Sequence, residues 1–187
     1  RALGRVRCAP PKTADSEDHV TVIADYTDDE QQLLRAALEA AAVAISAASP
    51  GRQEETASEG FAAADFVLKS RPRYVGNTLV TSILVQLEED LKHDHVFPDY
   101  QRVATAPGAL DGAMNTLARV TRLLDQKTPP QEAAGYKRWL LDIARVTAQA
   151  GKEDQGFLGM GGVMVNDAER SAYQAVAGTL GVTASEI

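Results

Sequence analysis

The spacing of apolar residues along the chain predicts an all-α protein. In six stretches, large apolar side chains recur every three or four residues, which places them on one face of a helix. The first predicted helix begins at Thr27 and ends at the Ser-Pro-Gly break at 49–51; the others cover 52–70, 75–91, 108–126, 129–150 and 166–180. We therefore expect a single-domain bundle of about six helices, with a glycine-rich loop docked before the last one.

Capping motifs support three of these helix starts. In Thr27-Asp-Asp-Glu30 and in Asn166-Asp-Ala-Glu169, the first side chain accepts from the amide three residues on, and the glutamate reaches back. In Thr128-Pro-Pro-Gln131, Thr128 is predicted to cap the helix and Pro129 to take its first position, where a missing N–H costs nothing. Residues 93–107 read as a connection between helices.

The helix expected over 52–70 has the weakest pattern. Its apolar side is formed by Phe61, Ala64, Val67 and Leu68, and glutamates lie on its early turns.

Composition and charge narrow the function classes. Of 187 residues, 44% are hydrophobic, only 5% are aromatic, and alanine, the best helix former, dominates the apolar fraction. The formal net charge of −7 argues against a general nucleic-acid binder, which needs clustered Lys and Arg. The single cysteine, Cys8, excludes an internal disulfide and a cysteine-based zinc site. No apolar run is long enough for a transmembrane segment, so we expect a soluble, cytoplasmic protein.

Charge also divides the beginning of the chain. Residues 1–14 hold four basic residues and no acid, whereas 15–30 hold seven acids and no Lys or Arg. This split predicts an N-terminal arm over 1–26, within which 19–25 is expected to be a short extended segment, and a helical domain over 27–187. The arm reads as a solvated native arm, the remnant of a targeting peptide or an addition to the natural chain.

The stretch 151–165 combines five of the 14 glycines with large apolar side chains. We interpret it as an irregular segment that packs on the helices or docks on a partner, because a solvated loop would not need so many apolar residues. The predicted docking residues are Phe157, Leu158, Met160, Val163 and Met164.

The sequence offers two alternative candidate sites for small ligands. Backbone amides at Gly159, Gly161 and Gly162 could hold an anion, although no Walker or Rossmann spacing is present and acids occupy the following helix start. His93 and His95 could converge on a metal ion if their segment is extended, although no second carboxylate-histidine motif supports a di-metal bundle.

Three segments carry a resemblance. The opening Tyr26-Thr-Asp-Asp-Glu30, the helix end 42–51 and the closing 153–169, which contains Gly-Phe-Leu-Gly-Met-Gly-Gly, resemble a family of small all-helical bacterial proteins with no assigned function. The chain departs from that family's closing signature at Gln155, Met160 and Asn166. The resemblance implies a single α-helical domain and carries no catalytic residues.

A second likeness concerns the last helix. Its start is similar to helix starts in tellurite-resistance TerB-like domains, which place Ala-Asp-Gly before the helix. Here glycine and valine occupy that position, so the metal role is not carried over.

The sequence therefore predicts a non-enzymatic interaction or structural module that works with a protein partner or as a homo-oligomer, without a cofactor. The alternative is a small-molecule, phosphate or metal-binding protein with a stress-related role like that of TerB-like domains. Catalytic motifs are absent from the sequence.

Overall fold

The computed structural model describes residues 20–49, 53–92, 99–150 and 165–187. These ranges contain seven α-helices and two short 3-10 helices, η1 and η2, and no strand, which confirms the all-α prediction. The elements are η1 (Ile23–Asp25), α1 (Asp28–Ser46), α2 (Gln53–Lys69), η2 (Arg71–Arg73), α3 (Thr78–Lys92), α4 (Tyr100–Ala104), α5 (Ala109–Lys127), α6 (Pro130–Ala150) and α7 (Asp167–Leu180).

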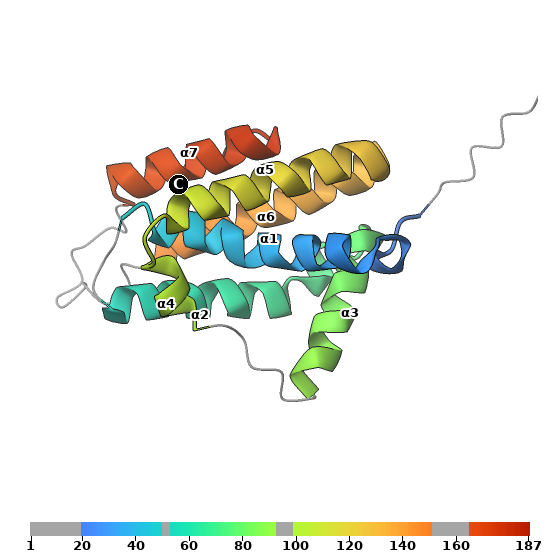
Figure 1. Cartoon of the computed structure of the whole chain (residues 1–187), viewed down its shortest axis with the longest axis horizontal. Helices are drawn as coiled ribbons and strands as arrows, with labels where there is room; N and C mark the ends of the chain where they lie inside the picture. Colours follow the sequence, from blue (N-terminus) through green and yellow to red (C-terminus); the bar gives the residue numbers. More distant parts are fainter. Residues whose placement is uncertain (1–19, 50–52, 93–98, 151–164) are drawn as a thin grey trace, which may run out of the picture.

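Helix α1 lies at the centre of the bundle. It packs against α5, α6 and α7 on one side, while α2 and the short α4 lie on the other (Figure 1). Helix α2 is therefore at the edge of the bundle opposite α7, and α3 extends away from the bundle near the end of α2 (Figure 1). Leu34 and Ile45 of α1 are fully buried, as are the α6 aromatics Tyr136 and Trp139.

The structure confirms two of the predicted capping boxes and corrects the third. Thr27 and Asn166 cap α1 and α7 as expected. The prediction for Thr128 was wrong, because α6 starts at Pro130 and the Thr128 hydroxyl bonds to the hydroxyl of Tyr26 at 2.5 Å. The Thr128 hydroxyl, which was expected to cap the helix, is hydrogen-bonded to the buried Tyr26 instead.

Glu132, in the first turn of α6, instead serves a neighbouring helix. Its carboxylate accepts hydrogen bonds from the amides of Thr78 and Leu79, each at 3.1 Å, at the start of α3. The Asn77 side chain donates to the Glu132 carbonyl at 2.9 Å, and it fits only because Gly135 lacks a Cβ. The N-terminal end of α3 is thereby held on α6.

Two further segments differ from expectation. Within the expected connection 93–107, residues 100–104 form the short helix α4, capped by Asp99. Within the expected arm, Ile23 and Tyr26 are buried in the core, and Ile23–Asp25 is a 3-10 helix rather than an extended segment. Packing therefore begins inside the segment that the charge pattern assigned to the arm.

Candidate interaction surface on helix α2

Helix α2 turns its apolar side outward. The side chain of Phe61 is 75% exposed and that of Leu68 is 42% exposed, and Ala57 and Ala64 are exposed between and beside them. We call these four residues the α2 face. Of the four residues predicted to form the apolar side, Phe61, Ala64 and Leu68 are thus exposed, whereas Val67 packs partly buried against the core.

The opposite side of α2 faces the bundle; its fully buried residues are small or polar, and Phe66 and Val67 pack partly buried beside them. Thr56, Glu59 and Ala63 are its buried members. Small side chains let α2 approach its neighbours closely, so the helix docks with this side although it offers less apolar area. Helix α2 exposes Phe61 and Leu68 while it buries the side chain of Glu59, and such local conflicts are expected at functional or strained sites.

A buried polar contact holds the N-terminal half of α2. The Ser46 hydroxyl at the end of α1 donates to the Glu59 carboxylate, and the Tyr100 hydroxyl of α4 lies 2.7 Å from the Ser46 oxygen. Because the single hydroxyl hydrogen of Ser46 goes to Glu59, Tyr100 is the donor to Ser46. Burial, followed by the nearby Glu59 and Glu39 carboxylates, raises the pKa of Tyr100 and keeps this donor protonated.

The Tyr100 ring also lies against the backbone of α2. A Cβ added at Gly60 would lie 2.4 Å from the Tyr100 ring, which is closer than van der Waals contact allows. Only glycine at position 60 lets α4 pack this closely on α2, so Gly60 belongs to the support of the α2 face.

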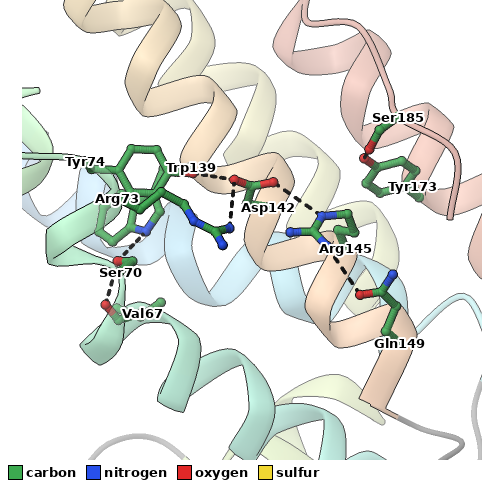
Figure 2. A network of polar contacts seen from close by, with 10 residues as sticks. All are labelled: Val67, Ser70, Arg73, Tyr74, Trp139, Asp142, Arg145, Gln149, Tyr173 and Ser185. Carbon is green, nitrogen blue, oxygen red and sulfur yellow. Dashed lines mark hydrogen bonds and ion pairs between the residues drawn. The ribbon is translucent and has the colours of Figure 1, made fainter. Parts of the chain in front are cut away.

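A second contact holds the C-terminal end of α2. The indole N–H of Trp139 donates to the Ser70 hydroxyl at 3.0 Å, and Ser70 in turn donates to the Val67 carbonyl at 2.7 Å (Figure 2). Just beyond, the Tyr74 hydroxyl donates to Asp142 of α6 at 2.5 Å. Helix α2 is thus fixed at Glu59 in its N-terminal half and at its C-terminal end by bonds to other helices.

Asp142 is fully engaged in this network. One carboxylate oxygen accepts from Tyr74 and lies 3.9 Å from Arg73, and the other lies 3.4 Å from Arg145 (Figure 2). Burial and the bond to Asp142 raise the pKa of Tyr74. Since the carboxylate is committed to three partners and the phenol stays protonated, this arrangement ties α2 to α6 and offers no general base.

The surface beside the α2 face is hollow but shallow. A groove of about 350 Å³ runs between α2 and α6. On its α2 side, Asp65 and Lys69 form an ion pair at 2.6 Å, and the Arg73 guanidinium lies 5.6 Å from the centre of the Phe66 ring. Asp65 and Lys69 offset each other's charge, and Arg73 lies near Asp142 and Phe66, so the groove borders the α2 face with polar groups.

The α2 face is distinct from the other exposed apolar residues of the described chain. The large ones outside α2 are Val20, Val75, Val85 and Leu91. Val85 and Leu91 both belong to α3 but, six residues apart, point to different sides of it. Single exposed apolar residues are ordinary, whereas Phe61 and Leu68 are aligned on one side of one helix.

The site residues predicted from the sequence all lie outside the described residues. This holds for the docking residues Phe157, Leu158, Met160, Val163 and Met164, for the anion-binding glycines Gly159, Gly161 and Gly162, and for the metal ligands His93 and His95. They stay predictions. In the part of the chain that the structure describes, no group of three or more His, Cys, Asp or Glu residues could hold a metal ion, and no helix is long and apolar enough to cross a bilayer.

Sequence reasoning missed the α2 face, although a signal was present. Thr56, Gly60, Ala63 and Ser70 repeat at roughly helical spacing and form a second, small-residue side that competes with the apolar side for the core. The sequence alone does not decide which of the two sides is buried, because that depends on the residues that lie opposite each side.

No protein-family model matches the chain, and no curated protein or solved structure shows significant similarity to it.

Proposed function

We propose that this protein is a non-enzymatic interaction module that binds another protein through the α2 face. The observation that supports this most directly is the orientation of α2. It presents Phe61 and Leu68 to solvent, while buried hydrogen bonds at Glu59 and at Ser70 hold the helix on the bundle. Full burial of a side chain of this size is worth roughly 1.5–3 kcal/mol. A partner could supply most of that amount at Phe61, which is 75% exposed, and less than half of it at Leu68, which is 42% exposed.

The support beneath the face fits this role. A surface whose side chains and helix are already fixed loses less conformational freedom on binding than a loop does. Phe61 is a rotamer-poor aromatic residue at the middle of the stripe, and paired charges at Asp65 and Lys69 border it. An apolar centre with a polar rim is the usual composition of protein interfaces.

Photo-cross-linking at the face tests the proposal. The full chain is produced in cells with a benzoyl-phenylalanine at position 61, and a matched chain carries the same group at position 75. Val75 is 77% exposed but lies outside the face, so it reports chance encounters. We expect a discrete covalent adduct from position 61 that position 75 does not give. Equal adducts from both positions, or none from position 61, would refute a partner at the α2 face.

A further inference from the structure

We infer that the partner of the α2 face is a second copy of this chain, bound with the two α2 helices antiparallel. This inference rests on the proposed function and names its partner. It follows from the order of residues along the face and from the charges at the ends of α2.

The face is self-complementary about its own midpoint. Phe61 and Ala64 lie at equal distances on either side of the midpoint between residues 62 and 63, and so do Ala57 and Leu68. A two-fold axis at this midpoint places each large side chain of one copy opposite a small side chain of the other. Phe61 then packs on Ala64 of the second copy, and Leu68 packs on Ala57.

The charges at the two ends of α2 favour the same arrangement. Glu54 lies in the exposed first turn, and Lys69 lies in the exposed last turn. In an antiparallel pair, Glu54 of one copy lies near Lys69 of the other, and the helix dipoles oppose one another favourably. A parallel pair would bring glutamate to glutamate, lysine to lysine and Phe61 to Phe61.

The position of α3 is compatible with this pairing. Helix α3 extends away from the bundle near the C-terminal end of α2 (Figure 1). Antiparallel pairing puts the α3 helices of the two copies at opposite ends of the interface, where they do not compete for space. Such a dimer follows the isologous geometry of most homodimers.

A single helix face buries less than the roughly 800 Å² per partner of a standard stable interface. The dimer is therefore expected to be transient and to dissociate on dilution. Sedimentation of the full chain should show a reversible monomer–dimer equilibrium. Phe61→Ala should raise the dissociation constant by about tenfold or more, as for a central aromatic contact. Val75→Ala, in an equally exposed residue outside the face, should leave it unchanged.

Engineered cysteines test the direction of pairing in a Cys8→Ser background. An equal mixture of Ala57→Cys and Leu68→Cys chains should form a disulfide-linked dimer on mild oxidation. Each variant alone should not, because its two cysteines would lie roughly 16 Å apart along the paired helices. Disulfide-linked homodimers of each variant, with no mixed Ala57→Cys/Leu68→Cys dimer by mass, would refute antiparallel pairing. Circular dichroism should show that all variants keep the helical fold.

The outcomes separate this inference from the proposed function. If the wild-type chain stays monomeric at every concentration while position 61 cross-links to a different protein in cells, the second copy is refuted and the interaction module stands. If the chain stays monomeric and position 61 gives no specific adduct, both fail. A specific adduct of twice the chain mass, together with the disulfide pattern above, supports both.

Discussion

Replacing Gly60 with alanine tests how α4 and α2 fit together. Two effects oppose each other. Alanine in the interior of a helix is more stable than glycine by about 0.5–1 kcal/mol. The added Cβ, however, would lie 2.4 Å from the Tyr100 ring, so the ring must move by roughly 1 Å to reach contact distance.

The movement has a calculable consequence. A ring displaced that far lengthens the 2.7 Å contact between the Tyr100 and Ser46 hydroxyls and weakens support for the buried Glu59. Overpacking costs about 1–3 kcal/mol, and leaving a buried polar group short of a partner costs a similar amount. Adding these two costs and subtracting the helix-propensity gain, we expect Gly60→Ala to lower the free energy of unfolding by about 3 kcal/mol.

Urea unfolding followed by circular dichroism measures this difference. Gly112→Ala is the matched control, since Gly112 is exposed within α5 and an added Cβ there meets nothing within 4 Å. It should stabilise the protein by about 0.5–1 kcal/mol. In a Tyr100→Ala background, Gly60→Ala should recover the same gain because the clash is gone. The packing argument is wrong if Gly60→Ala stabilises the wild-type protein as much as Gly112→Ala does.

Two further predictions concern the core and the ion pairs. Tyr136→Phe removes the buried 2.5 Å hydrogen bond from the Tyr136 hydroxyl to the Leu34 carbonyl and should lower the free energy of unfolding in urea by about 1 kcal/mol. Tyr173→Phe should lower it less, because the Tyr173 hydroxyl bonds to Ser185 near the surface. Equal losses in the two variants would contradict this ranking. The hydrogen bond from Lys127 lowers the pKa of Glu30. The ionised Glu30 carboxylate therefore stabilises the fold fully above the ordinary glutamate pKa, and this stabilisation is lost as pH falls through the lowered pKa. Glu30→Gln should therefore lower the melting temperature at neutral pH but not in strong acid, and a difference that persists in strong acid would contradict the assignment.

The sequence alone determined the helices and most of their buried sides. Apolar residues such as Leu34 and Ile45 in α1, or Ile83 in α3, recur on a single side, so burial of that side was the only arrangement that removes them from water. The caps at Thr27 and Asn166 depend on neighbours three residues away, and local sequence was enough to predict them. Local information was insufficient for Thr128, whose partner Tyr26 is 102 residues distant.

The α2 face was decided only by the tertiary structure. The sequence of α2 offers two sides for burial, an apolar one with Phe61 and a small, polar one with Glu59. The choice depends on Ser46, Tyr100 and Trp139, which belong to three other helices and supply the hydrogen bonds at the small side. Burying a carboxylate is costly without a partner and acceptable with one. The side of α2 that carries Phe61 can therefore face solvent because the fold places Ser46, Tyr100 and Trp139 against the opposite side.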